Sequence, residues 1–341
     1  MYATSKETVD TSLIDTLSTQ TFTQILHREE TLFWHPDDST LIAKQQTDKS
    51  KQSRLVLAAA SLHFDSLANI FVALGIDKQI LQIELNKYHQ IYDKTVINVS
   101  CELPETLQWR ERIAEVSRQY FMDIFVQEDV NIESKGLVVF DMDSTLIEME
   151  CIDEIAILAG VGEQVAEVTE KAMRGEIEFS ESLHHRVKCL EGVSLDALLN
   201  IRQRLPFMPG FTLLIQELKK HDWKIAIASG GFTYFADHIK QQFGFDYAFS
   251  NTLELVGERL SGRVSGDIVD AQAKADILEK LATNNNIQLK HTIAVGDGAN
   301  DLLMMAKAGA GIAFKAKPKV EAQAANAIRF SGLEGVLYLL G

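Results

Sequence analysis

Short apolar segments, each followed by a polar or glycine-rich turn, recur along the carboxyl-terminal part of this 341-residue chain. They are Leu137–Phe140 (LVVF), Lys224–Ala228 (KIAIA), His291–Val295 (HTIAV) and Gly311–Phe314 (GIAF). Runs of this kind are typical of strands that are buried on both faces of a parallel sheet. Because helical patterns separate them, right-handed β-α-β crossovers and a doubly wound α/β sheet are expected.

The segments between these strands have the apolar spacing of amphipathic helices. They are Phe211–His221, Phe232–Phe243, Ala271–Thr283 and Asp301–Lys307, and a hairpin is expected over Leu253–Val264. A mostly helical insertion at about residues 148–206 breaks the alternation, and Phe179, Leu183 and Val187 recur within it at helical spacing. This insertion predicts a helical cap over the carboxyl ends of the strands, where open α/β sheets bind ligands.

A smaller amino-terminal α+β domain is predicted over residues 1–132, ahead of the core and cap at residues 133–341. The first forty residues are polar and are expected to pack loosely, and Gln127–Lys135 is the candidate linker. Strands are predicted at Arg54–Leu62, Lys94–Cys101 and Asp123–Gln127, and helices at Phe64–Leu74 and Thr106–Phe121. Such alternation favours a small α/β or α+β module.

The charge balance narrows the function classes. The chain has 33 Lys and Arg against 48 Asp and Glu, a formal net charge of −15. This argues against a nucleic-acid partner, which needs clustered basic residues, and against a coat on an anionic membrane. No stretch approaches the ~18 apolar residues of a membrane-spanning helix. Three dispersed cysteines make a disulfide framework improbable, so a reduced, cytoplasmic location is expected.

The segment Asp141–Thr145 (DMDST) directly follows the first apolar strand. The carboxylates of Asp141 and Asp143 would repel each other at the buried end of a strand. A hard cation such as Mg²⁺ removes this objection, because it prefers oxygen ligands and commonly takes one or two carboxylates. Helix capping is the simpler alternative, but it accounts for one such residue and not for two aspartates. The motif therefore predicts a functional site.

Polar loops follow two further strands. Gly296–Asp301 (GDGAND) adds two carboxylates, and Asp141 and Asp297 can share a metal ion if their strands are neighbours. An ordinary Asx-rich turn is the alternative. Ser229–Gly231 (SGG) places a hydroxyl and glycine amides at a helix start, which suits an anion but is a weak signal by itself. Lys274, taken alone, would be a solvated surface residue.

Together these motifs resemble those of the haloacid-dehalogenase-like (HAD) phosphatases, over about residues 136–341. Within the insertion, Glu150–Glu154 (ECIDE), Ala172–Gly175 (AMRG) and Phe179–Val187 resemble the phosphoserine phosphatase family. The resemblance implies a HAD-type doubly wound sheet with a helical cap, and Mg²⁺ as cofactor. The first 130 or so residues resemble the amino-terminal extension of longer bacterial members, for which an ACT-like module is the expectation.

The resemblance also implies roles for individual residues of the core. Asp141 would be the nucleophile that forms an aspartyl-phosphate, and Asp143 would act first as general acid and then as general base. The Asp141 and Asp297 side chains and the Asp143 carbonyl would hold Mg²⁺. The remaining implied positions are Ser229, Gly230 and Lys274 for the phosphoryl oxygens, Asn300 for substrate orientation, and Thr145 and Asp301 as supporting residues. Asp301 is expected to brace Lys274 or the water shell of the metal rather than to bind the metal directly.

Substrate choice is expected to come from the cap. Phosphoserine carries an ammonium and a carboxylate besides its phosphate, and a buried site needs a counter-charge for each. Glu150 is the implied partner of the ammonium, Arg186 of the carboxylate, and Met173 an apolar wall of the pocket. The implied reaction is hydrolysis of O-phospho-L-serine to L-serine and phosphate, the last step of serine biosynthesis.

Two other functions stay open at this point. One is a HAD phosphatase or phosphotransferase that acts on another small phosphomonoester. The other is an amino-acid-sensing regulatory protein with an inert HAD core, which the presence of every required acid disfavours. The expected partners are a small-molecule substrate and a second copy of the chain in a homodimer, with no nucleic acid and no membrane.

Overall fold

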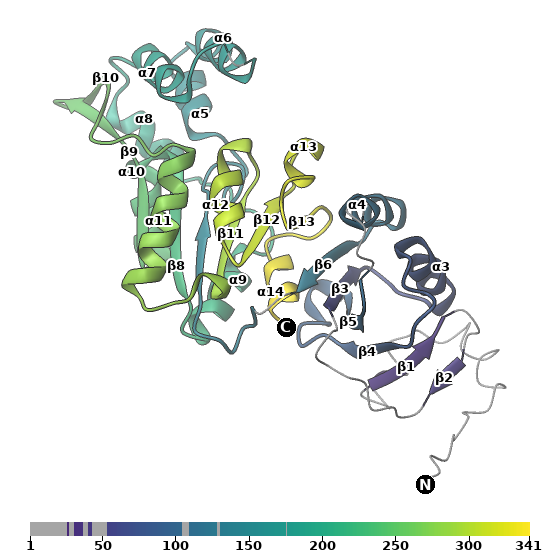
Figure 1. The fold of residues 1–341 in the computed structure, drawn as a ribbon. Coiled ribbons are helices and arrows are strands. Elements are labelled where there is room, and N and C mark those ends of the chain that lie inside the picture. Colours follow the sequence, from purple (N-terminus) through teal and green to yellow (C-terminus); the bar gives the residue numbers. More distant parts are fainter. Residues whose placement is uncertain are drawn as a thin grey trace. The chain divides into compact units, whose positions relative to one another are not determined.

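The structure, a computed structural model, describes residues 26, 31–36, 40–42, 53–103, 109–127, 130–174 and 176–341. The chain divides into two compact units, one formed by Met1–Asn131 with Asn326–Gly341 and the other by Ile132–Ala325. Figure 1 labels the helices and strands of both. None of the helices in the described ranges is long and apolar enough to cross a membrane.

The first unit contains an antiparallel sheet. Its strands are β1 (Thr31–His35), β2 (Thr40–Ile42), β3 (Ser53–Ala59), β4 (Leu81–Leu85), β5 (Thr95–Cys101) and β6 (Asp123–Gln127), in the order β2-β1-β4-β5-β3-β6. Its helices are α3 (Phe64–Leu74), α4 (Trp109–Tyr120) and the short η2 (Ile91–Asp93). From β3 to β6 the order β-α-β-β-α-β is that of a ferredoxin-like module. The ACT-like assignment of this unit stays a prediction.

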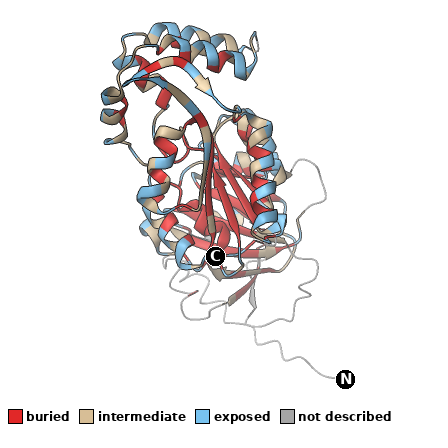
Figure 2. Cartoon of the chain, turned by 90° about the vertical axis from the view of Figure 1, so that its left-hand side faces the viewer, coloured by how far each residue is buried: buried red, intermediate tan, exposed pale blue. Residues whose placement is uncertain are grey.

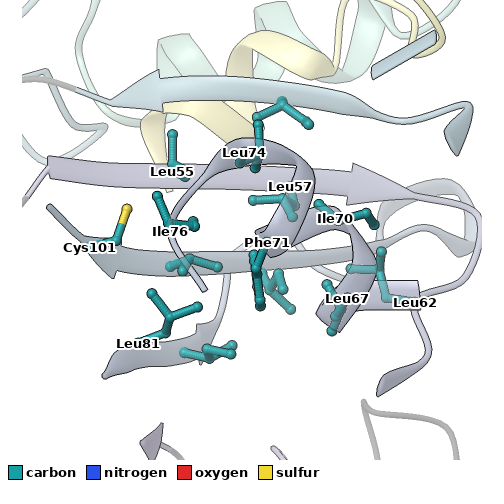
Figure 3. Packing of buried hydrophobic residues seen from close by; sticks show 14 of the residues in the cluster. Leu55, Leu57, Leu62, Leu67, Ile70, Phe71, Leu74, Ile76, Leu81 and Cys101 are labelled. Carbon is teal, nitrogen blue, oxygen red and sulfur yellow. The ribbon is translucent and has the colours of Figure 1, made fainter. Parts of the chain in front are cut away.

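The core of the first unit forms because one apolar face of the sheet meets the apolar faces of its helices. Figure 3 shows Leu55 and Leu57 of β3 lying against Phe71 and Leu74 of α3. Trp34 of β1 joins them, with its ring edge-on to Phe71 at 5.6 Å between centroids. The sequence had suggested a loosely packed lead-in here. That expectation is wrong for Thr31–His35, which pairs with β4 and in which Leu32, Phe33 and Trp34 are buried.

The last residues of the chain belong to this first unit. Strand β13 (Asn326–Ile328) and helix α14 (Gly335–Leu340) flank a segment whose backbone is held by Asp123. The buried Asp123 carboxylate accepts N–H hydrogen bonds from Arg329 (2.7 Å), Phe330 (3.1 Å) and Ser331 (2.8 Å). The predicted division kept residues 326–341 in the second domain. The structure corrects that boundary, because the partners of this segment lie about two hundred residues earlier.

The second unit is a doubly wound α/β sheet. Its strands are β7 (Leu137–Phe140), β8 (Lys224–Phe232), β9 (Tyr247–Val256), β10 (Arg259–Ser265), β11 (Thr292–Gly296) and β12 (Ala310–Phe314), in the order β10-β9-β8-β7-β11-β12. Pairing is parallel from β9 to β12, and β9 and β10 form the expected antiparallel hairpin. The flanking helices are α9 (Phe211–Lys220), α10 (Thr233–Phe243), α11 (Ala271–Asn284), α12 (Leu302–Lys307) and α13 (Pro318–Glu321), with short turns η3 (Leu289–His291) and η4 (Ala299–Asp301).

Strand β7 is central in this sheet, and all four of its residues are fully buried. Figure 2 shows buried strands with helices on both sides, whose outer faces are exposed. The sequence LVVF is therefore apolar throughout because both faces of its strand are covered. A doubly wound α/β sheet with an inserted helical region is what the sequence led us to expect, and the fold confirms it.

The helical insertion comprises α5 (Cys151–Leu158), α6 (Gly162–Met173), α7 (Phe179–Cys189) and α8 (Leu195–Arg202). Its two connections to the sheet run side by side. Ile147 and Phe207 form an antiparallel bridge, and the Glu148 N–H donates to the Pro206 carbonyl at 2.8 Å. Because one connection leaves directly after β7, the insertion is anchored at the carboxyl end of the central strand.

Candidate active site

The site lies where β7, β8 and β11 end. Asp141 follows the last residue of β7, and its N–H donates to the Val295 carbonyl of β11 at 2.9 Å. Because β8 and β11 flank β7 in parallel, their carboxyl-terminal loops meet beside Asp141. The end of β8 carries Ser229 and the loop after β11 carries Asp297, so the topology brings three of the sequence motifs to one edge of the sheet.

Three aspartates and a lysine form the centre of the site. One carboxylate oxygen from each of Asp141, Asp297 and Asp301 lies within 4.8 Å of the others. Lys274 Nζ lies 2.8 Å from Asp141 Oδ2 and 2.7 Å from Asp301 Oδ1, and its side chain is 1% exposed. Burial alone would lower the pKa of Lys274, but the two carboxylates outweigh it and raise that pKa. Lys274 is thus a buried cation and not a solvated surface residue.

The cluster contains more negative charge than Lys274 can balance. Burial, followed by repulsion from Asp141, raises the pKa of Asp297 from 3.8 to about 6, although the Thr145 hydroxyl donates to Asp297 Oδ1 at 3.2 Å. Burial and Asp141 also raise the pKa of Asp301, against the opposing effect of Lys274. Oxygen donors with uncompensated negative charge suit a hard divalent cation, so the residues present fit such an ion.

The second aspartate of DMDST sits in a different environment. The Asp143 carboxyl is buried, and its Oδ1 has no hydrogen-bond partner among the described residues. Burial first, and then the negative charge of Glu150, raise the pKa of Asp143 well above its ordinary value. The position of a Gly231 Cβ would lie 2.7 Å from Asp143 Oδ2, so glycine is needed there. Asp143 therefore favours its protonated form.

The SGG segment is extended backbone at the end of β8, four residues longer than the predicted strand, and α10 begins only at Thr233. The buried Ser229 Oγ accepts the Gly231 N–H at 3.0 Å, which leaves its own O–H proton available to an anion. Asn251 fixes the loop, because its amide donates to the Gly230 carbonyl at 2.8 Å and accepts the Val269 N–H at 2.9 Å.

Two charged residues of the insertion lie over this edge. Glu150 precedes α5, and its Oε1 accepts the Ser144 hydroxyl at 2.7 Å. Although part of Glu150 faces solvent, loss of water around its carboxyl raises its pKa, and Asp297 and Asp141 add to the shift. Arg186 of α7 is surrounded by the charges of Asp153, Glu150 and Asp143, and its buried Nε has no hydrogen-bond partner in the described chain.

The remaining predicted residues lie as follows. Asn300 is in η4 with its Oδ1 against Gly298, at 2.1 Å from the position of a Gly298 Cβ. Met173 ends α6, and its side chain is outside the described part of the structure, as is Gly175 of the AMRG motif. The structure thus brings the core motifs, Glu150 and Arg186 together, and leaves Met173 as a prediction.

Sequence reasoning missed three residues of the site. Asn251 is an ordinary strand residue until its amide is seen to hold the SGG loop. Cys151 is buried and hydrogen-bonds the Asp143 side chain, and Asp153 is the first of the charges that act on Arg186. Cys151 and Asp153 stand in ECIDE, close after the expected substrate residue Glu150, and that position was the available signal for these two residues.

The doubly wound sheet, the helical insertion and the acidic cluster at the strand ends define an α/β protein with a candidate cation site at the carboxyl ends of its strands. The profile of the haloacid dehalogenase-like hydrolases matches residues 136–309, and the chain belongs to that family.

Curated relatives extend this match. The phosphoserine phosphatase of Vibrio cholerae is 55% identical over 215 residues, which are 63% of this chain and 66% of that protein, slightly less than two thirds of its length. The phosphoserine phosphatase of Haemophilus influenzae is 44% identical over 276 residues, 79% of this chain and 88% of that protein. A crystal structure of a probable phosphoserine phosphatase from Vibrio cholerae, in unliganded form, has a TM-score of 0.72 at 42% identity and covers 87% of this chain and 88% of that one.

Proposed function

We propose that this chain hydrolyses O-phospho-L-serine to L-serine and phosphate through an aspartyl-phosphate, with Mg²⁺ as cofactor. Its similarity to relatives named phosphoserine phosphatase supports the substrate class. The observation that carries the proposal is the placement of Arg186 and Glu150, a cation and an anion, over the Asp141 edge of the sheet. A phosphorylated amino acid carries a carboxylate that can pair with Arg186 and an ammonium that can pair with Glu150.

In the first step an Asp141 oxygen attacks phosphorus, and the bond from phosphorus to the seryl oxygen breaks. Asp143 gives its proton to that leaving oxygen. Its buried carboxyl supports this role, because a raised pKa keeps an acid protonated until the substrate needs the proton. The products of the step are free serine and a phosphorylated Asp141.

In the second step Asp143, now a carboxylate, takes a proton from a water molecule that attacks the aspartyl-phosphate. The bond from phosphorus to Asp141 breaks, phosphate leaves, and both aspartates return to their first state. The same carboxyl group thus serves as general acid in the first step and as general base in the second, so no further proton carrier is needed.

The phosphoryl oxygens need positive partners while charge moves through the transition state. Lys274 supplies a buried cation that two aspartates hold in place. The Ser229 hydroxyl and the Gly230 N–H complete the cradle, and Asn251 keeps its backbone in position. Asn300 is proposed to orient the substrate, with Thr145 supporting Asp297 and Asp301 bracing Lys274.

The Asp141 and Asp297 side chains, with the Asp143 carbonyl, are the residues proposed to hold Mg²⁺. When bound, the ion supplies positive charge that screens the phosphate, so that an anionic nucleophile can approach an anionic substrate. Calcium or manganese would also meet oxygen donors here, and a comparison of activity across these cations tests the assignment of Mg²⁺.

The direct test of the proposal is phosphate release from O-phospho-L-serine by the purified protein with Mg²⁺. Activity that disappears in Asp141→Asn supports it, whereas release no higher than in that variant contradicts it. A panel of small phosphomonoesters, with and without an acceptor alcohol, separates phosphoserine hydrolysis from a broader phosphatase or a phosphotransferase.

We further propose a cytoplasmic location and a homodimer. The location is supported by three free cysteines, of which Cys101 and Cys151 are buried. The dimer rests on the appended ferredoxin-like unit, since modules of this kind often self-associate. Light scattering on the full chain tests it, with twice the 38.1 kDa mass of the chain as the expected result and a single-chain mass as the contrary one.

A further inference from the structure

Ser182 of α7 carries a buried hydroxyl that no group in the described part of the chain pairs with. The residue is 1% exposed, and its Oγ makes no hydrogen bond to any part of the chain that the structure describes. Buried polar atoms are nearly always paired, so each exception needs an explanation. A buried hydroxyl without a hydrogen-bond partner lowers the stability of the folded protein.

The direction of Ser182 follows from its neighbours on the helix. At 3.6 residues per turn, Ser182 lies about 40° around the helix from Arg186 and about 60° from Phe179. It lies about 100° or more from Leu183 and Val187, which fill the interior of the insertion. Around the helix the order is therefore Ser182, Arg186, Phe179, Leu183 and Val187, so Ser182 borders Arg186 on the side away from the buried apolar residues.

The side of α7 that carries Phe179 and Arg186 faces the candidate site at both ends. Phe179 Cζ lies 3.0 Å from the position of a Gly230 Cβ in the SGG loop. About two turns further on, Arg186 is subject to the charges of Asp153, Glu150 and Asp143. Ser182 lies between these two residues along the helix and about 40° around it from Arg186, so its buried hydroxyl borders the space between the SGG segment and the acidic residues.

We propose that Ser182 is a specificity residue whose hydroxyl donates a hydrogen bond to the carboxylate of the substrate, beside Arg186. This inference deepens the proposed function and rests on it. Three buried polar atoms around this space have no partner within the described chain, namely Ser182 Oγ, Arg186 Nε and Asp143 Oδ1. A carboxylate accepts several hydrogen bonds at once and pairs with the two donors from α7, while Asp143 meets the leaving oxygen.

Ser182→Ala tests the proposal, with Ser180→Ala, an exposed serine on the same helix, as the matched control. The expected result is a fall of about tenfold in kcat/KM for O-phospho-L-serine and no change for O-phosphoethanolamine, which lacks the carboxylate. The melting temperature of the ligand-free protein should stay the same or rise, because an unpaired buried hydroxyl is removed. Equal losses on both substrates, no loss on either, or a lower melting temperature would overturn the proposal.

Calorimetry separates this proposal from the proposed function. O-phospho-L-serine is titrated into Asp141→Asn and into Asp141→Asn with Ser182→Ala, neither of which needs to turn over. A tenfold weaker binding in the double variant supports the role of Ser182 even if the wild-type protein releases no phosphate. Equal binding by the two variants, or absence of binding by both, contradicts it.

Discussion

Lys274 and Asp141 form a buried ion pair, with Nζ 2.8 Å from Oδ2 and side-chain exposures of 1% and 7%. The two residues lie 133 positions apart and come from α11 and the end of β7. A cation at this depth is held only by the carboxylates around it, and it leaves the site with a fixed positive charge beside the proposed nucleophile. Stability and chemistry are therefore coupled at this pair.

Replacing Lys274 with Met is expected to lower the free energy of unfolding by about 3–5 kcal/mol, because Asp141 and Asp301 would lose their buried cation. Urea denaturation of the variant without metal measures this loss. Lys171→Met is the control, since Lys171 forms an exposed pair with Glu167 and no change is expected. A Lys274→Met protein as stable as the wild type would contradict the buried pair.

Asp297 is expected to make the stability of the metal-free protein depend on pH. Its pKa is raised from 3.8 to about 6 on folding, so the folded state binds this proton more tightly than the unfolded state. The stabilising proton is present below pH 4, and its contribution is lost as the pH rises to about 6. Asp297→Asn should flatten part of this decline, as followed by thermal unfolding between those pH values.

The Asp297→Asn variant also tests whether Asp297 belongs to the metal site. At neutral pH, Mg²⁺ should raise the melting temperature of the wild-type protein, because a ligand that binds only the folded state stabilises it. Asp297→Asn should be more stable than the wild type without metal and should respond less to Mg²⁺. The exposed Asp237→Asn is the control for both measurements. An equal response to Mg²⁺ in all three proteins would exclude Asp297 from the ion site.

Arg186→Ala is expected to lower kcat/KM for O-phospho-L-serine by about 10²–10³-fold, because the carboxylate of the substrate would be desolvated without its cation. Activity on O-phosphoethanolamine should change much less. Lys188→Ala, an exposed cation on the same helix, controls for net charge. If both substrates suffer equally, Arg186 serves the structure of the insertion and not the choice of substrate.

Asp123→Asn should destabilise the protein by roughly 2–4 kcal/mol, because an amide cannot accept all three N–H groups of residues 329–331 as a carboxylate does. Limited proteolysis should then release the carboxyl-terminal segment, which mass spectrometry identifies. The exposed Asp93→Asn is the matched control in the same unit. Unchanged proteolysis of Asp123→Asn would mean that this carboxylate does not hold the segment.

Much of the second unit could be predicted because the apolar pattern that identifies each strand lies within that short segment of the sequence. LVVF at 137–140 is buried on both faces, and the helices after it show one apolar stripe each, so periodicity alone places them. The end of β8 was less predictable. Ser229 and Gly230 look like a turn, but neighbouring contacts, among them the Asn251 amide, hold them as extended backbone.

Features that depend on distant partners escaped the sequence. Asn326 donates to and accepts from the backbone of Val126, 200 positions earlier, and no periodicity links the two. Lys274 is similar, since a lysine in an amphipathic helix normally faces water and its burial depends on carboxylates from the segments that follow β7 and β11. Only the resemblance of the combined motifs suggested its position in the site.

The central claim is that Asp141 carries the phosphoryl group during turnover, and chemical trapping tests it most directly. The protein is quenched while it turns over O-phospho-L-serine with Mg²⁺, treated with borohydride, and digested for peptide mass spectrometry. An aspartyl-phosphate is reduced to homoserine, so we predict homoserine at position 141, dependent on substrate and absent in Asp141→Asn. Steady phosphate release with residue 141 unmodified, or reduction at a different carboxylate, would contradict the account.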